Sequence, residues 1–238
     1  MSRSRDRRPR RTSPLLPRRP IGLVVVALVA LTLTACGDAS GGTTATGANG
    51  PGPSSGPPLP SLLIQASDLP PDFRPSTGES AGYRFTLCGV DLEPTPATEQ
   101  ASARFATNEV GPFVEQRVRR YPDDSQAHVI DAMTAALRTC TTTKATDPSA
   151  PGRDTTFTVS PLDLPRFADQ SVAWHQVAAS SPQVPTDVVL MRQGRTIVLV
   201  TSYTFGQATD PDAVLAAARA AADRLTASGA PGGPETRP

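Results

Sequence analysis

Residues 186–203 read TDVVLMRQGRTIVLVTSY. Two apolar runs, Thr186–Met191 and Arg195–Tyr203, flank the pair Gln193-Gly194. Glycine in the second place of a two-residue loop favours a β-hairpin turn, although Asn or Asp at position 193 would be a stronger signal. Ile197–Val200 is apolar at every position, which is typical of a strand covered on both faces. The stretch therefore predicts an antiparallel hairpin whose second strand is buried.

Further strands and a short helix are expected upstream of this hairpin. Strands are predicted at Gly111–Tyr121, Thr155–Ser160 and Ser171–Ala179, and a short helix over Leu62–Leu69 is stopped by Pro70-Pro71. In the first of these strands, Val114 and Val118 share one face. The opposite face carries Glu115, Arg117, Arg119 and Tyr121.

Two longer helices follow from apolar residues at helical spacing. The first is capped by Asp123 or Asp124 and runs to about Arg138, with Ile130, Met133 and Leu137 on one face. The last begins at Asp210-Pro211, and its buried stripe is Leu215, Ala218, Ala222 and Leu225. Consecutive strands and a hairpin predict an α+β fold, with a mostly antiparallel sheet and helices packed on one side.

The first 35 residues have the order of a signal peptide. Residues 1–20 contain eight Arg and one acid, and the 15 residues of Ile21–Ala35 carry no charge. A transmembrane helix needs roughly 20 apolar residues, so a lasting span is the poorer interpretation. Leu33-Thr34-Ala35-Cys36 resembles the bacterial lipobox, in which the Cys thiol is lipidated and the chain is cut before it. The alternative is an ordinary signal peptide followed by an incidental Cys.

These features divide the chain into four parts. We expect a signal peptide at 1–35, the lipidated Cys36 and a disordered Gly/Ser/Pro linker at 36–60, a folded domain at 61–227, and a disordered tail at 228–238. The protein is then held by lipid at the outer face of the cytoplasmic membrane, on the extracytoplasmic side.

Three cysteines are present in the chain, and lipid on Cys36 leaves an even pair. An exported compartment permits disulfides, so we predict a Cys88–Cys140 bond; the alternative is two free buried thiols. In the predicted helix, Cys140 follows Leu137 by three residues, a spacing that turns it toward the core.

Charge argues against a nucleic-acid partner. The full chain has 23 basic and 22 acidic residues, and removal of the signal peptide leaves 15 basic and 21 acidic ones, a net charge of −6. Nucleic-acid binding requires a basic patch.

A loose pattern over about 60–227 is similar to the PknH-like extracellular sensor domain, which occurs outside actinobacterial receptor Ser/Thr kinases and in free-standing lipoproteins. The residues that carry the resemblance are Leu62-Leu63, Asp68-Leu69-Pro70, Gly111-Pro112-Phe113-Val114, Tyr121-Pro122, Cys140, Thr156-Phe157-Thr158-Val159, Pro161-Leu162, Asp169-Gln170-Ser171-Val172-Ala173 and Gly194-Arg195. The resemblance implies a cleft between helices and a curved sheet that binds an extracellular ligand. Kinase-linked members can carry a second disulfide, for which this chain lacks the cysteines. It also lacks a kinase domain, so any signal must pass through another protein.

Two groups of residues are candidates for ligand contact. Arg117, Arg119 and Tyr121 share a strand face and could meet a phosphate or carboxylate; the alternative is a solvated strand with protective charges. Trp174, the single Trp, could line a sugar or peptide groove, but it shares a face with Val172, which favours a core position.

Catalytic and metal-binding patterns are missing from the sequence. His128 and His175 have no Cys, His or acid at metal-ligand spacing, and no nucleophile elbow, P-loop or dinucleotide fingerprint occurs. We therefore expect no catalytic residue, no metal and no cofactor.

Two functions remain. The first is a ligand-binding lipoprotein with a persistent cleft, whose ligand is an unknown extracellular molecule. The second is a structural or partner-binding envelope lipoprotein with an exposed apolar patch.

Overall fold

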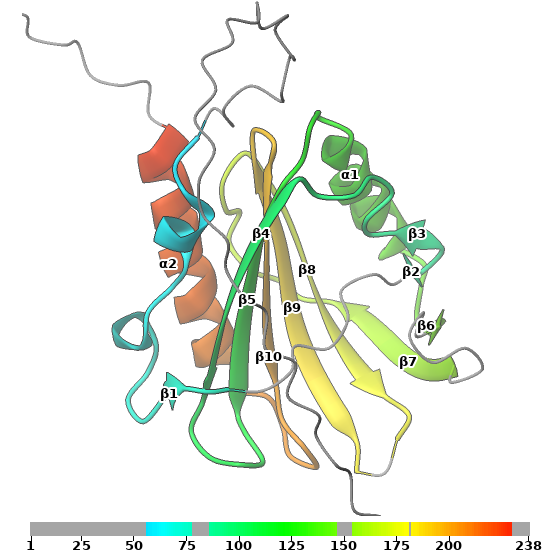
Figure 1. Cartoon of the computed structure of the whole chain (residues 1–238). Helices are drawn as coiled ribbons and strands as arrows, with labels where there is room; N and C mark the ends of the chain where they lie inside the picture. The colour runs from blue at the N-terminus through cyan, green and yellow to red at the C-terminus, as the bar shows by residue number, and fades with distance from the viewer. Residues whose placement is uncertain (1–55, 78–85, 147–153, 181, 230–238) are drawn as a thin grey trace, which may run out of the picture. The chain divides into compact units, whose positions relative to one another are not determined.

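A large antiparallel sheet forms the centre of the domain in the computed structural model (Figure 1). The structure describes residues 56–77, 86–146, 154–180 and 182–229, all within one compact unit. The predicted signal peptide, Cys36 and the linker up to residue 55 lie outside the described residues, as does the tail from residue 230. None of the described helices is long and apolar enough to cross a membrane.

Eight strands make up this sheet, and every neighbouring pair is antiparallel. Their spatial order is β1 (Arg74–Pro75), β4 (Glu99–Ala106), β5 (Phe113–Arg120), β10 (Thr196–Tyr203), β9 (Val184–Gln193), β8 (Gln170–Ala178), β7 (Asp154–Pro161) and β6 (Thr142–Thr146). A separate two-stranded ribbon consists of β2 (Thr86–Leu87) and β3 (Val90–Asp91). The α+β class and the antiparallel sheet are thus confirmed.

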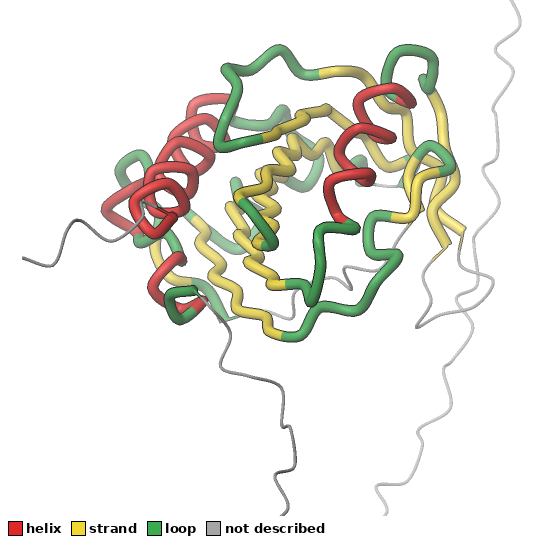
Figure 2. Tube along the Cα trace, turned by 90° about the horizontal axis from the view of Figure 1, so that it is seen from above, coloured by secondary structure: helices red, strands yellow, loops and turns green. Residues whose placement is uncertain are grey.

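The two α-helices lie on opposite faces of the sheet, so the expectation of helices on one side is wrong. Seen from above, the sheet curves around α1 (Gln126–Ala136), while α2 (Pro211–Gly229) lies on its outer side (Figure 2). The reason is visible in β9, where Val188 and Leu190 pack with α1, whereas Val189 and Met191 pack with α2. A strand that is apolar at consecutive positions needs cover on both faces.

The outer layer contains α2 and the N-terminal segment. Small residues of α2, among them Ala217, Ala218 and Ala221, are fully buried against the sheet. The helix starts as predicted, because Asp210 Oδ1 accepts the backbone N–H groups of Asp212 and Ala213 at 3.0 and 3.3 Å. Leu215 of the predicted stripe is only partly buried.

The N-terminal segment forms two short 3₁₀ helices, η1 (Leu59–Leu62) and η2 (Ala66–Asp68), in place of the single helix predicted over Leu62–Leu69. Leu59 is 3% exposed and belongs to the core, although the expected linker included it. The folded region also extends past the expected end at 227, because α2 continues to Gly229.

Local turn geometry corrects two further details. The β9–β10 turn is formed by Gly194 and Arg195, one residue later than predicted, and Gly194 has φ +54°. The N-cap of α1 is Ser125 rather than an Asp; Asp123 Oδ1 instead accepts the Ser125 N–H at 3.0 Å, in the turn before the helix. Hydrogen bonds from the side chain and backbone of Ser125 lower the pKa of Asp123.

Candidate functional site

A groove opens between α1 and β8 because the pairing of β7 with β8 stops early. The β7–β8 register ends at Pro161↔Trp174, with one more backbone bond from Leu162 N–H to the Ala173 carbonyl at 3.1 Å. The chain then leaves the sheet and returns at Phe167, which is buried on the α2 side. Between this 162–168 loop and α1 lies an open cavity of about 530 Å³.

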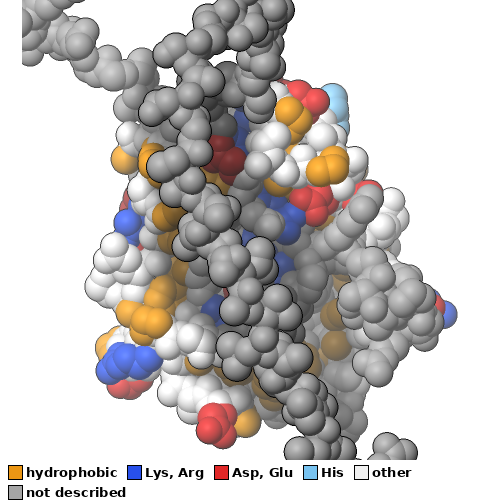
Figure 3. Space-filling view, in the orientation of Figure 1, with side chains coloured by type: hydrophobic (Ala, Val, Ile, Leu, Met, Phe, Trp, Pro, Cys, Tyr) orange, Lys and Arg blue, Asp and Glu red, His pale blue; other side chains and the backbone are white. Residues whose placement is uncertain are grey.

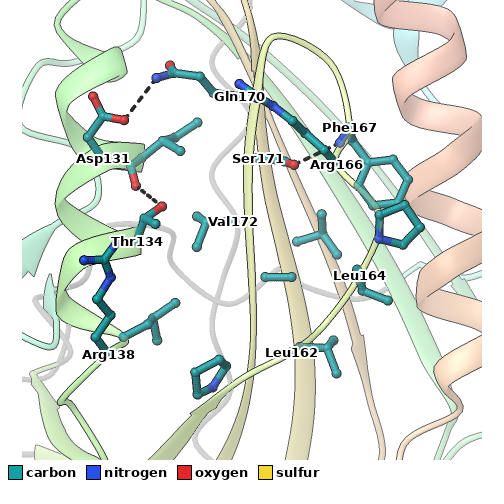
Figure 4. Close-up of a pocket in the computed structure, with 16 residues that line it drawn as sticks. Asp131, Thr134, Arg138, Leu162, Leu164, Arg166, Phe167, Gln170, Ser171 and Val172 are labelled. Carbon is teal, nitrogen blue, oxygen red and sulfur yellow. Dashed lines mark hydrogen bonds between the residues drawn. The ribbon is translucent and has the colours of Figure 1, made fainter.

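Apolar side chains from three elements line this groove. Figure 4 shows Val172 of β8 between α1 and the loop residues Leu162 and Leu164. Ile130 and Leu137 of α1 complete this part of the lining. A volume of this size lies within the range of small-molecule sites, roughly 300–1,000 Å³, which are mostly apolar with a few placed polar groups.

Polar side chains close one end of the groove through internal hydrogen bonds. Gln170 Nε2 donates to Asp131 Oδ1 at 3.1 Å (Figure 4), and Gln170 Oε1 accepts from Arg192 Nε, outside the lining, at 2.7 Å. Ser171 Oγ accepts the Phe167 N–H at 2.9 Å, which ties the loop to the strand. These bonds fix the shape of the groove without a ligand.

Two arginines that line the groove have N–H donors that form no hydrogen bond with the described residues. Arg166 Nη2 donates to the Asp169 carbonyl at 2.7 Å, which uses one of its five N–H donors. The Arg138 guanidinium has no hydrogen bond or ion pair with any residue that the structure describes. Figure 4 shows Arg138, just beyond the C-terminal end of α1, away from the Asp131–Gln170 bridge, so the groove has a bridged end and a cationic end.

The predicted charged face of β5 is present, and its arginines are in ion pairs. Arg119 pairs with Glu93, and the Nε and Nη2 of Arg117 donate to Glu115 Oε1 at 2.9 and 2.8 Å. On the face seen in Figure 3, basic side chains accordingly lie beside acidic ones. Tyr121 is 1% exposed, and its pKa is raised to about 12 by burial and then by the negative charge of Glu93. Binding of an anion by this face stays a prediction.

Trp174 belongs to the core and does not line the groove. Its side chain is 0% exposed, in the cluster that also contains Met133 of α1. Its indole N–H donates to Gln176 Oε1 at 2.9 Å. A ligand cannot reach a fully buried ring, so the proposed contact role of Trp174 is wrong and the alternative core position is correct.

Neither histidine is hydrogen-bonded to a Ser or Thr hydroxyl among the described residues. His128 is exposed on α1, and His175 Nδ1 lies 2.6 Å from Asp187 Oδ1 on the face opposite α1. Ser160 lies opposite His175 in the β7–β8 register, yet no hydrogen bond joins their side chains in the described structure. The described residues also contain no cluster of three His, Cys, Asp or Glu side chains that could hold a metal ion.

The predicted disulfide is confirmed. Cys88 and Cys140 are bonded, with their Cα atoms 5.8 Å apart and 52 residues apart in sequence. Cys140 lies just beyond α1, so the bond ties the end of that helix to the β2–β3 ribbon. The helix side of the groove is therefore anchored covalently.

The resemblance implied a cleft between helices and a curved sheet, but sequence reasoning identified neither the position of the groove nor its arginines. The available signal was the segment 161–167, in which apolar residues alternate with Pro, Asp and Arg between two predicted strands. Such a segment indicates a loop that packs against the protein, but it does not show that a cavity lies beneath it.

Comparison with known proteins supports the fold. No family model and no curated protein matches the sequence. The chain is similar to the extracellular domain of PknH from Mycobacterium tuberculosis, with TM-score 0.50 and 12% identity over 71% of this chain and 94% of that one. An uncharacterized protein of Mycobacterium smegmatis, an Rv0999 ortholog, matches with TM-score 0.37 and 12% identity over 68% of this chain and 91% of that one. The fold of this domain is thus similar to that of the PknH extracellular domain.

Proposed function

We propose that this chain is a membrane-anchored extracytoplasmic lipoprotein whose domain binds a small amphipathic ligand in the groove between α1 and β8. The observation that carries the proposal is the groove itself: a cavity of about 530 Å³ with an apolar lining and an arginine at one end. The likeness to the extracellular domain of PknH, a sensor-type fold, supports the proposal.

The ligand that fits has an apolar body and a polar end. Leu162, Leu164 and Val172 offer contacts to the apolar body, while Arg138 at the cationic end offers contacts to the polar end. Anionic groups suit guanidinium donors best, because the hydrogen bonds are then charge-assisted. Cell-wall fragments and lipids are two sources of such molecules outside the cell.

A blocked groove tests this proposal. Thr134 is an exposed α1 residue in the groove lining, so Thr134→Trp should fill the cavity with little cost to the core. Ala135 is the adjacent exposed residue outside the lining, and Ala135→Trp is the matched control. The soluble chain 37–238 and both variants are screened by thermal shift against cell-wall fragments, lipids and small anions.

A ligand of the groove should raise the melting temperature of the parent and of Ala135→Trp in a saturable way, and leave Thr134→Trp unchanged. A ligand that stabilises both Trp variants equally binds elsewhere, and this result would contradict binding in the groove. The proposal also excludes catalysis, and covalent labelling of Ser160 by a fluorophosphonate probe would overturn that part.

The lipid anchor rests on the sequence LTAC at 33–36. Metabolic labelling with a palmitate analogue should modify the wild-type chain and not a Cys36→Ala variant. The variant should also lose its stable membrane association, because acyl chains supply the binding energy. Equal labelling of both proteins would contradict the lipobox assignment.

A structural or partner-binding role is the second candidate. It is favoured by the exposure of Val110 (51%) and Phe205 (41%), which are adjacent because the Phe205 N–H donates to the Val110 carbonyl at 3.2 Å. Two side chains make a smaller surface than the patches that mark protein interfaces, typically a few hundred Å² or more. The groove is therefore the stronger site.

A further inference from the structure

Arg104 of β4 is held by aromatic rings at the far end of the sheet from α1. Its guanidinium lies 4.6 Å from the centre of the Phe113 ring, and its Nη2 donates to the Tyr203 hydroxyl at 3.0 Å. Phe113 and Tyr203 are stacked with centroids 4.9 Å apart, and Phe205 meets them edge-on at 5.8 and 6.1 Å. Side chains of β4, β5 and β10 thus fix the position of this cation.

Arg104 forms no ion pair with a carboxylate of the described residues. Its cross-strand neighbour on β5 is Glu115, whose Oε1 accepts two hydrogen bonds from Arg117 instead. Arg104 Nε is buried without an acceptor, and the described structure shows one hydrogen bond from the five N–H donors of this side chain. Keeping a partly buried cation without a counter-ion is costly, so the arrangement favours an external anion.

An open cavity of about 530 Å³ adjoins this cation. Its lining includes Arg74, Arg104, Asn108, Phe113 and Phe205. Glu109 is the single acid in the described lining, against two arginines, so the lining is net positive. The partly exposed Phe205 ring offers a flat apolar surface at the same place.

We propose that this cavity, the Arg104 cavity, binds a carboxylate or phosphate group attached to a flat apolar body such as an aromatic ring. The anion accepts hydrogen bonds from Arg104, because the planar guanidinium matches the geometry of carboxylate and phosphate oxygens. The ring of the ligand packs on Phe205. The Arg104 cavity shares no lining residue with the groove between α1 and β8, so the two proposals are independent.

Calorimetric titration of the full chain in a non-ionic detergent tests the site with four probes. Phenyl phosphate and benzoate carry both features, inorganic phosphate carries the anion alone, and phenol carries the ring alone. We expect saturable binding of phenyl phosphate or benzoate, weaker binding of inorganic phosphate and none of phenol. The stronger of the first two identifies the anion as a phosphate ester or a carboxylate.

Variants then locate the site. Arg104→Gln should weaken phenyl phosphate and benzoate by roughly tenfold or more, since one charge-assisted pair is worth about that factor. Arg104→Lys should lose less, because it keeps the charge. Phe205→Ala should weaken the ring-bearing probes and leave inorganic phosphate unchanged. The control Arg219→Gln, at an exposed α2 position outside both cavities, should change none of these affinities, and Arg138→Gln reports any binding of the probes in the groove.

Three results would overturn the proposal. The first is the absence of saturable binding of any anionic probe. The second is equal affinity of Arg104→Gln and the parent, or loss of binding in Arg138→Gln instead. The third result concerns Phe205→Ala, an exposed position that tests the site even if Arg104→Gln does not fold. Unchanged affinity of Phe205→Ala for both ring-bearing probes would overturn the proposal.

Discussion

Gln116 joins the N-terminal segment to the middle of the sheet, and its replacement gives a well-defined test of the fold. The side chain is 0% exposed on the α2 face of β5. Its Oε1 accepts the Ile64 N–H at 2.7 Å, and its Nε2 donates to the Leu62 carbonyl at 3.0 Å. The side-chain amide of Gln116 thus holds the segment that follows the predicted linker against the sheet.

Gln116→Leu has nearly the same size and removes both bonds. The Ile64 N–H and the Leu62 carbonyl then remain buried without partners, at a cost of about 1–3 kcal/mol each. The apolar Leu side chain recovers about 1 kcal/mol through burial. We therefore expect the free energy of unfolding to fall by about 1–5 kcal/mol.

Urea unfolding followed by Trp174 fluorescence measures this loss. With a dependence of about 2 kcal/mol per molar urea, the midpoint should drop by roughly 0.5–2.5 M. Gln100→Leu, at an exposed position of the neighbouring β4, is the matched control and should stay within about 0.5 kcal/mol of the parent.

Equal midpoints for Gln116→Leu and Gln100→Leu would refute the reasoning. A lower slope with an unchanged midpoint would also refute it, because the N-terminal segment would then have detached without destabilising the sheet.

Other residues give further predictions. Replacing Cys88 and Cys140 by Ser removes a cross-link between residues 52 positions apart and should lower the free energy of unfolding by about 4 kcal/mol. A urea midpoint equal to that of the parent would contradict this prediction. Tyr121 has a folded pKa of about 12 against 10.0 for the free side chain, so stability should fall as pH rises between these values, and Tyr121→Phe should abolish that fall. Asp210→Ala should lower stability by about 1 kcal/mol through loss of the α2 cap, with no change in the slope of urea unfolding. The buried Trp174 should resist iodide quenching until the domain unfolds, and strong quenching of the native protein would contradict its core position.

Elements with strong local patterns could be predicted from the sequence. The β9–β10 hairpin, β8, α2 and the Cys88–Cys140 bond were all identified, because apolar runs, a helix cap and cysteine parity are local signals. By contrast, β4 was missed. Its residues Ala101, Ala103 and Ser102 have low strand propensity, and the strand exists because β5 supplies a pairing edge.

Candidate site residues were harder to predict than the elements that carry them. The spacing of Arg117 and Arg119 showed that they share a face of β5, but not that Glu115 and Glu93 pair with them. Trp174 was correctly assigned to a strand. Its complete burial depends on α1, and the sequence does not show which face of the sheet this helix covers.

The sequence by itself predicted export and lipidation signals, and it determined the order of most strands and helices and the Cys88–Cys140 disulfide. These depend on residues that are close in the chain or on the pairing of two remaining cysteines. Only the tertiary structure decided which face each helix covers, and that the early end of the β7–β8 pairing opens a groove. It alone placed Arg104 among aromatic rings from separate strands, with no ion pair to a carboxylate of the described residues. The physical reason is that cavities and counter-ions depend on side chains brought together from distant parts of the chain.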